Sequence, residues 1–342
     1  MTSADAGNGD GHRADLVLEG GGARGVALVG AVTAMSEAGY VFPRIAGTSA
    51  GAMLGGIAAA MQSAGEPLDG LRRVAMDVDF AGFADRGTLG RLAGPLAPLV
   101  DVGELLVENG MFRGDALHEF LVRTLADFGV HTWADLRLPD DEGTSLPESH
   151  RYALVVTVSD ISRRRLVLLP WDYGRYGLDP DTQPVADAIR MSASLPVFFQ
   201  PAHLRGAGTT SVMVDGGLLS DYPITVFDRT DGRPPRWPTF GVKLSGRPPA
   251  TPRTHPVDGP LSYLLAVVNT VMTALDARPL DDPCVRRRTV FLDSKDVSAT
   301  DFDIDRETKK EMIDDAARVT REFLAHWDFA GYLRDCRGGE QP

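Results

Sequence analysis

The sequence has little cysteine: Cys284 and Cys336 are the only two in 342 residues. Small secreted domains that rely on disulfides carry more, and residues 1–15 contain no apolar run of the kind found in secretion signals. The two cysteines are therefore expected to be free thiols in a reducing cytoplasm. Neither they nor the histidines show the spacing of zinc ligands, so the sequence implies no metal and no other cofactor.

Positive charge is also scarce. The chain has 35 lysines and arginines against 47 aspartates and glutamates, which leaves a formal net charge of −12 at pH 7. Nucleic acids and anionic membranes would repel such a protein as a whole, which argues against a general binder of either kind. Two short basic runs, residues 163–165 and 286–288, are more typical of solvated turns or strand flanks than of a lipid headgroup site.

The sequence has little that could cross a membrane. Residues 45–65 carry no charge and are long enough to span a bilayer of roughly 30 Å. They are rich in glycine, alanine, serine and threonine, however, which is more typical of a helix buried in protein. We therefore expect no transmembrane helix.

Apolar residues make up 43% of the chain, which is enough to bury a sizeable core. The length alone allows two domains, but the glycine-rich motifs described below extend over about 200 residues and argue for one. We expect this domain to cover residues 14–330. A polar, disordered tail over residues 1–13 and a C-terminal tail over residues 331–342 complete the predicted organisation.

Three short segments are each apolar at the start and rich in glycine at the end, the pattern of a buried strand that ends in a tight turn. The first offers backbone N–H donors, the second contains a candidate nucleophile, Ser49, and the third contains a candidate base, Asp215. Donors, nucleophile and base together predict an acyl-transfer site. The three segments are residues 16–25, 47–51 and 212–217.

The Gly-x-Ser-x-Gly pattern at residues 47–51 is weak by itself, because a chain with 37 glycines contains such a pattern by chance roughly 0.2 times. Its context is more informative. Residues 50–62 are uncharged and have apolar side chains at helical spacing, so Ser49 is expected at a strand-to-helix elbow that exposes its hydroxyl. The dipole of the following helix favours developing negative charge there.

The glycine loop has a second interpretation, since Gly20-x-Gly22-x-x-Gly25 also fits the dinucleotide-binding fingerprint. That fingerprint requires an acidic residue about 20 positions later to hold a ribose. The only candidate is Glu37, near the end of the predicted first helix. Three successive glycines are more consistent with a loop whose N–H groups point at an oxyanion, where each donor is typically worth about 10²–10³ in kcat.

The three motifs, in this order and each after a predicted strand, resemble those of the patatin-like phospholipases, lipid acyl hydrolases with a Ser–Asp dyad. The family pattern is Gly-Gly-Gly-x-Arg/Lys-Gly, then Gly-x-Ser-x-Gly, then Asp-Gly-Gly or Asp-Gly-Ala, found here at residues 20–25, 47–51 and 215–217. Residues 188–201 and 297–302 resemble further segments of the family. The resemblance therefore extends from about residue 15 to about residue 327.

The resemblance implies that Ser49 is the nucleophile, that Asp215 is the general base, and that the oxyanion donors lie at Gly20, Gly21 and Gly22. One departure from the family is Asp221-Tyr222-Pro223, where relatives often carry Asn-x-Pro. Arg24 would either anchor the glycine loop or meet a substrate phosphate, and the structural role is preferred. The remaining motif residues that would support the site are Gly25, Gly47, Gly51, Gly216 and Gly217.

An α/β-hydrolase triad would place a histidine after the acid, on a loop that follows a late strand. Only His255 and His326 come after Asp215, and neither directly follows a predicted strand. His203 precedes Asp215 and is more typical of a surface or packing residue. A dyad is therefore preferred. Because an unshifted aspartate has a pKa near 4, such a dyad must depend heavily on stabilisation of the oxyanion.

Strand and helix patterns along the chain predict an α/β fold, a three-layer sandwich with a largely parallel central sheet. Residues 66–147 indicate a helical insertion after the nucleophile helix, with an apolar stripe from Leu117 to Phe128, and this insertion could form a lid over the acyl pocket. A terminal helix, apolar from Met312 to Trp327 and capped by Asp305, would close the fold. The predicted strands lie at residues 15–18, 41–46, 152–159, 166–169, 212–214, 240–244 and 289–292.

We therefore expect a cytoplasmic serine lipid acyl hydrolase that cleaves carboxylic ester bonds of phospholipids or lysophospholipids through an acyl-serine intermediate. Its expected partners are the lipid substrate and, transiently, a membrane or micelle surface, and not a nucleic acid. The same site would serve a transacylase, a non-lipid esterase or a thioesterase, because only the acyl acceptor or the leaving group changes. A lipid-binding regulator that keeps the fold without the activity is the alternative of a different class.

Overall fold

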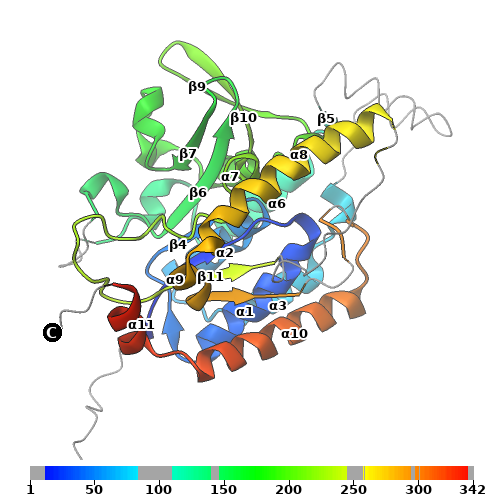
Figure 1. Ribbon diagram of the computed structural model, residues 1–342. Coiled ribbons are helices and arrows are strands. Elements are labelled where there is room, and N and C mark those ends of the chain that lie inside the picture. Colours follow the sequence, from blue (N-terminus) through cyan, green and yellow to red (C-terminus); the bar gives the residue numbers. More distant parts are fainter. Residues whose placement is uncertain are drawn as a thin grey trace, which may run out of the picture.

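The computed structural model describes residues 12–83, 110–139, 146–244, 257, 259–293, 297–299 and 301–337. Eight strands of this part of the chain form one sheet, in the order β12 (Thr289–Phe291), β11 (Thr239–Lys243), β2 (Asp15–Leu18), β4 (Ile45–Gly47), β6 (Leu154–Asp160), β10 (Thr209–Asp215) and β9 (Ala202–Gly206), with β7 (Arg165–Leu169) paired to β6 (Figure 1). The strands from β12 to β6 are parallel, whereas β7, β9 and β10 are antiparallel to their neighbours. The predicted α/β fold with a largely parallel sheet is confirmed.

Alternate residues of the parallel strands point to opposite faces of the sheet, and both faces are covered. Leu16 and Ile45 belong to the larger hydrophobic core on one face. Val17 and Ala46, their neighbours in sequence, belong to a second core on the other face. Burial on both faces explains why these strands show continuous apolar runs rather than an alternation, and it produces the predicted three layers.

Helices cover the larger core, and an irregular segment with short helices covers the second. Those over the larger core are α1 (Val26–Glu37), α2 (Ala50–Ser63), α3 (Gly70–Asp77), α6 (Asp115–Ala126), α7 (Val185–Ser192) and α10 (Arg306–Ala325). The second core contains residues of the chain after β10, of η9 (Arg278–Asp281) and of α9 (Pro283–Arg287). In Figure 1, α10 runs beside α1 along one side of the molecule, and α8 (Pro260–Ala277) crosses the front.

The predicted terminal helix is confirmed as α10. The Asp305 side chain caps it by accepting a hydrogen bond from the Thr308 N–H at 2.7 Å. Met312 and Ile313 lie on its buried face, which packs against α1. Gly30 of α1 permits this close crossing, because a Cβ there would lie 2.0 Å from the Ile313 carbonyl oxygen.

The strand predicted over residues 41–46 is divided into β3 (Tyr40–Val41) and β4. Pro43 lies between them and has no N–H to offer a ladder. β3 pairs in parallel with β1 (His12–Arg13), so the last two residues of the predicted tail form a strand. The rest of that tail, residues 1–11, lies outside the described residues.

Within its described residues, the predicted helical insertion over residues 66–147 contains α3, α6 and two 3-10 turns, η2 (Ala81–Phe83) and η4 (Trp133–Leu136). It also contains β5 (Gly110–Phe112), which pairs with β8 (Val197–Phe199) in a small sheet that the sequence did not predict. The stripe residues Leu117, Leu121 and Leu125 of α6 are buried. Residues 84–109 and 140–145 lie outside the described residues, so the lid and the domain boundaries stay predictions.

Further 3-10 turns are η1 (Gly22–Gly25), η5 (Glu148–His150), η6 (Tyr173–Tyr176), η7 (Pro180–Thr182) and η8 (Gly216–Leu218). Over the ranges that the structure describes, no helix combines the length and the apolar character needed to cross a membrane.

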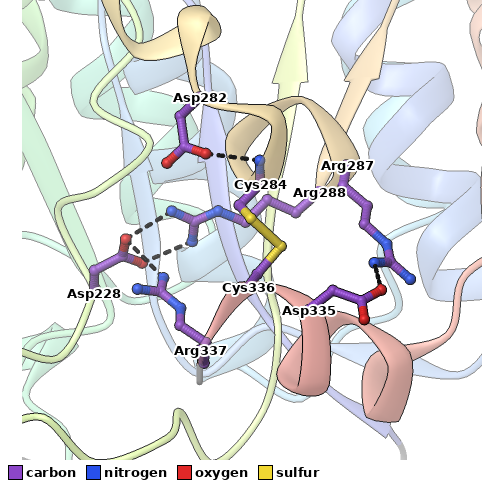
Figure 2. Close-up of a disulfide and its surroundings, with 8 residues drawn as sticks. All are labelled: Asp228, Asp282, Cys284, Arg287, Arg288, Asp335, Cys336 and Arg337. Atoms are coloured by element: carbon purple, nitrogen blue, oxygen red, sulfur yellow. Dashed lines mark hydrogen bonds and ion pairs between the residues drawn. A yellow bond between two sulfur atoms is a disulfide. The ribbon is translucent and has the colours of Figure 1, made fainter. Parts of the chain in front are cut away.

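A disulfide between Cys284 and Cys336 ties α11 (Phe329–Cys336) to α9 (Figure 2). The prediction of two free thiols is therefore wrong. The cysteines are 52 residues apart in sequence, but the two helices bring their Cα atoms to 5.6 Å, within the range of a disulfide. α11 also occupies much of the predicted tail over residues 331–342. Because persistent disulfides are typical of oxidising compartments, the argument from free thiols to a cytoplasmic location no longer holds.

Ion pairs surround the disulfide (Figure 2). The buried Arg288 guanidinium donates to both carboxylate oxygens of Asp228 at 2.7 Å each, and Arg337 reaches the same carboxylate at 2.9 Å. Arg287 of α9 is paired with Asp335 of α11 at 2.5 Å. Covalent and ionic contacts together join α9, α11 and the chain that follows β10.

Replacing both cysteines, Cys284→Ser with Cys336→Ser, should lower the free energy of unfolding by about 2–4 kcal/mol, because the cross-link restricts the unfolded chain over a loop of 52 residues. Urea unfolding followed by circular dichroism measures the difference. Reductant should destabilise the wild type by a similar amount and leave the double variant unchanged. Two reactive thiols in the native, unreduced wild type, with equal stability of the two proteins, would contradict the cross-link.

Candidate active site

Ser49 lies at the elbow between β4 and α2, as the sequence predicted. Its φ of 51° and ψ of −118° are unusual for a residue with a side chain, and such strain costs about 1–3 kcal/mol. The glycines on either side make the elbow tight. A Cβ on Gly51 would lie 2.4 Å from the Leu18 carbonyl oxygen, and a Cβ on Gly47 would lie 2.3 Å from the Gly51 carbonyl oxygen. The first turn of α2 can therefore lie against the ends of β2 and β4 only because both positions are glycine.

Asp215 reaches the same place through strand pairing. Val156 of β6 pairs with Gly47 of β4 on one edge, and Val158 pairs with Asp215 of β10. Both valines pair with β7 on the other edge, so β4 and β10 follow each other along the same edge of β6. The carboxylate of Asp215 therefore lies directly beyond the end of β4, where Ser49 begins the elbow.

The Asp215 side chain is held by its own loop. Its Oδ1 accepts a hydrogen bond from the Gly217 N–H at 2.8 Å, at the start of η8 (Gly216–Leu218). Its backbone N–H donates to the Ser194 carbonyl at 2.9 Å. Gly216 allows the loop to lie against β6, because a Cβ there would be 2.3 Å from the Thr157 carbonyl oxygen.

Burial changes the acidity of Asp215, which is 1% exposed. Desolvation raises the pKa of its carboxyl to about 6, against the opposing effect of hydrogen bonds from the Gly217 N–H and the Ser49 hydroxyl. The pKa of Asp215 therefore lies above the value near 4 that is typical of an unshifted aspartate. A base of this pKa accepts a serine proton more readily than an exposed aspartate does.

The N–H groups of the glycine loop after β2 differ in their hydrogen bonds. Among the described residues, no acceptor takes the N–H of Gly21 or Gly22. The N–H of Gly20 differs, because it donates to the Asp221 carbonyl at 3.2 Å. Of the three predicted oxyanion donors, Gly20 is engaged in a backbone bond, whereas Gly21 and Gly22 have no acceptor within the described part of the chain.

Several contacts fix this loop. Arg24 donates from Nε to the Gly21 carbonyl at 3.3 Å, which supports its structural role. Ala23 of η1 (Gly22–Gly25) donates its N–H to the Ala299 carbonyl at 2.9 Å. Gly25 brings the loop against the elbow, since a Cβ there would lie 2.5 Å from the Ala50 Cβ. Loop and elbow are therefore packed directly together.

A second carboxyl group, that of Asp221, also lies at the site. A Cβ on Gly20 would be 2.0 Å from Asp221 Oδ1 and 3.2 Å from the Ser49 Cβ, and a Cβ on Gly217 would be 2.8 Å from Asp221 Oδ1. Asp221 is the position at which relatives often carry asparagine. Its side chain therefore lies between the glycine loop and the aspartate loop.

Sequence reasoning missed the residues that support the elbow from α7. The Ser49 N–H donates to Ser192 Oγ at 2.8 Å. The buried Arg190 donates to Ser194 Oγ at 2.6 Å and to the Gly114 carbonyl at 3.0 Å. The signal was present, because all three side chains belong to the segment at residues 188–201 that resembles the family. An arginine between the apolar residues Ile189 and Met191 was the specific feature that could have revealed this network.

The histidines lie elsewhere. His203 is exposed on β9, and His326 follows α10, where its Nδ1 lies 2.8 Å from the Glu322 carbonyl oxygen. His255 lies outside the described residues. Within the described ranges, no histidine forms a hydrogen bond with Ser49 or Asp215.

A cavity of about 670 Å³ lies at the opposite end of the sheet. Its walls include Arg44, Trp237 and Ala153, which precede the strands β4, β11 and β6. Ser49 and Asp215, by contrast, follow β4 and end β10. The cavity contains none of the predicted site residues and is separate from the site described above.

Comparison with known proteins gives a consistent picture. A model of the patatin-like phospholipase family matches residues 16–228. The uncharacterized protein YqhO of Bacillus subtilis is 31% identical over 92% of this chain and 99% of its own length. Lysophospholipase nte1 of Neurospora crassa is 53% identical over 47 residues, which are 14% of this chain and 3% of that protein. The crystal structure of VipD from Legionella pneumophila has a similar fold, with a TM-score of 0.50, 16% identity, and coverage of 93% of this chain and 67% of that one.

If Asp215 is the base, kcat/KM should fall as the pH falls through about 6, because the carboxyl is protonated below that value and cannot accept the serine proton. A pH–rate profile between about 4 and 8 on a dissolved ester measures this limb. An unperturbed aspartate would instead place the limb near pH 4.

Stability provides the control for this prediction. Because the native pKa of Asp215 lies above its unfolded value, the proton stabilises the native state below about pH 4, and that stabilisation is lost as the pH rises through about 6. Asp215→Asn has no such proton and should gain stability relative to the wild type as the pH rises from about 4 to about 7. If kcat/KM falls only near pH 4 and Asp215→Asn shows no such gain in stability, the pKa of Asp215 is not raised.

A methyl group at Gly22 should damage the loop. Its φ is 55°, and a Cβ would lie 2.0 Å from the Ala299 carbonyl oxygen, so Gly22→Ala must move the backbone N–H. We expect kcat to fall by about 100-fold, with a smaller effect on substrate binding. Gly174→Ala is the matched control, because nothing lies within 4 Å of its Cβ position. Equal kinetics for the two variants would show that the loop donates nothing to the oxyanion.

Proposed function

Since the chain belongs to the patatin-like phospholipase family, we propose that it is a serine hydrolase that cleaves carboxylic ester bonds of phospholipids or lysophospholipids. The observation that carries this proposal is the arrangement along β6, which brings a buried carboxylate to a serine on a strained elbow. The name of the Neurospora relative, a lysophospholipase, favours substrates with a single acyl chain among the candidates.

In the proposed reaction, Asp215 takes the proton of the Ser49 hydroxyl as its oxygen attacks the ester carbonyl carbon. The carbonyl oxygen becomes an oxyanion and accepts hydrogen bonds from the N–H groups of Gly21 and Gly22. The C–O bond to the alcohol then breaks, and the alcohol leaves with the proton held by Asp215. The acyl group remains on Ser49 as an ester.

Water completes the turnover. Asp215 accepts a proton from the water that attacks the acyl-serine, and the same two N–H groups stabilise the second oxyanion. Release of the fatty acid returns the proton to Ser49. The raised pKa of Asp215 supports this role, because the carboxyl must alternately bind and release a proton near neutral pH.

Two substitutions test the proposal. Ser49→Ala and Asp215→Asn should each lower kcat/KM to about one-hundredth of the wild-type value or less on phosphatidylcholine and lysophosphatidylcholine, because one lacks the nucleophile and the other lacks the base. Product analysis by mass spectrometry identifies the bond that is cleaved. His203→Ala and His326→Ala are the matched controls and should retain activity.

Other outcomes of these experiments would indicate a different mechanism or a different function. A large loss in a histidine variant, with activity retained in Asp215→Asn, would replace the dyad by a triad. Transfer of the acyl group to an added alcohol in preference to water would identify a transacylase. Absence of turnover on the lipids and on short-chain esters and thioesters would favour the lipid-binding regulator.

A further inference from the structure

The helix α8 contacts the loop that carries the proposed base. It packs against η8, which directly follows Asp215. The Met272 Cε of α8 lies 2.6 Å from the position that a Cβ on Gly217 would occupy, so this side chain reaches the aspartate loop directly. α8 crosses the front of the molecule in Figure 1. One end of the helix thus belongs to the wall of the site, and the rest lies on the surface beside it.

The outward side of α8 is apolar. Tyr263, Leu264, Val267 and Val271 are 64%, 42%, 42% and 39% exposed, and their spacing places them along one face of the helix. Among the described residues, eight large hydrophobic side chains are exposed, and four of them lie on α8. Such a concentration on one element is unusual for a surface that meets only water.

The same helix carries no charge over residues 260–275. Helices that bind anionic membranes present lysines and arginines on their polar face, and none is available here. The net charge of −12 also opposes an anionic surface. The polar side chains along this stretch are those of serine, asparagine, threonine and tyrosine, which hydrogen bond without requiring an opposite charge. Charge therefore favours a lipid layer without net charge over an anionic one.

We propose that the exposed face of α8, formed by Tyr263, Leu264, Val267 and Val271, inserts into the surface of a zwitterionic lipid layer. This inference rests on the proposed function, because a lipid hydrolase must reach substrates that are packed in membranes or micelles. Insertion of α8 would bring the aspartate loop, and with it Ser49, to the lipid surface. The helix lies in the plane of the interface, with its other side packed on the protein.

Binding is tested without turnover by using Ser49→Ala as the background. Flotation with phosphatidylcholine vesicles should recover this protein, and adding Val267→Glu should weaken the partition at least tenfold, because a carboxylate must then enter the apolar layer. Ile161→Glu is the matched control. Ile161 is 46% exposed in the turn after β6, so Ile161→Glu introduces the same charge away from α8. This control variant should bind vesicles like the background. Leu264→Ser provides a second variant without a new charge and should also weaken binding.

Kinetics of the protein that retains Ser49 separate this proposal from the proposed function. Val267→Glu should lose at least tenfold more activity on phosphatidylcholine vesicles than on a dissolved short-chain ester. If the protein hydrolyses vesicles and Val267→Glu binds and cleaves them like the wild type, the docking face is wrong while the hydrolase stands. If no ester is cleaved but flotation still depends on Val267, the hydrolase is wrong while the lipid surface stands.

Two further outcomes would overturn the proposal. Stronger flotation with vesicles that contain phosphatidylglycerol than with pure phosphatidylcholine would contradict the requirement for a layer without net charge. Sedimentation velocity without lipid tests the other occupant, a second copy of the chain. A dimer that Val267→Glu dissociates, with vesicle binding unchanged, would make this face a subunit interface instead.

Discussion

The pairing of β6 with both β4 and β10 is the constraint on which the proposed site depends. The elbow and the aspartate come from segments more than 150 residues apart in sequence, and β6 holds them two residues apart along one edge. A shift of β10 by one residue would turn Asp215 to the opposite face of the sheet. The larger hydrophobic core opposes such a shift, because the buried Met213 of β10 packs in that core and would be turned away from it.

Burial makes Asp215 a stronger base, and it also destabilises the fold. A carboxylate removed from water is a stronger base, but its desolvation destabilises the fold at neutral pH. The positive φ of Ser49 adds backbone strain. The surrounding contacts compensate: the Ser192 hydroxyl binds the Ser49 N–H, and the buried Arg190 holds the following turn through Ser194. The same tight packing requires glycine wherever the loops touch.

The sequence predicted best what depends on local chemistry. Turn glycines, the bounds of β2 and the Asp305 cap each follow from a few neighbouring residues, and the structure has all of them. What it could not predict depends on contacts between distant segments: the Cys284–Cys336 disulfide, the raised pKa of Asp215 and the backbone bond that engages the Gly20 N–H. The exposure of α8 beside the aspartate loop belongs to this class too, because an apolar helix in sequence is normally a buried one.

The central claim is that Ser49 is a nucleophile activated by Asp215, and the most direct test is to locate a fluorophosphonate adduct by peptide mass mapping over a range of pH. We expect the adduct on the peptide that contains Ser49, formed at a rate that falls as the pH drops through about 6, and no adduct in Ser49→Ala. An adduct on a different peptide, or labelling that persists in Ser49→Ala, would contradict the account.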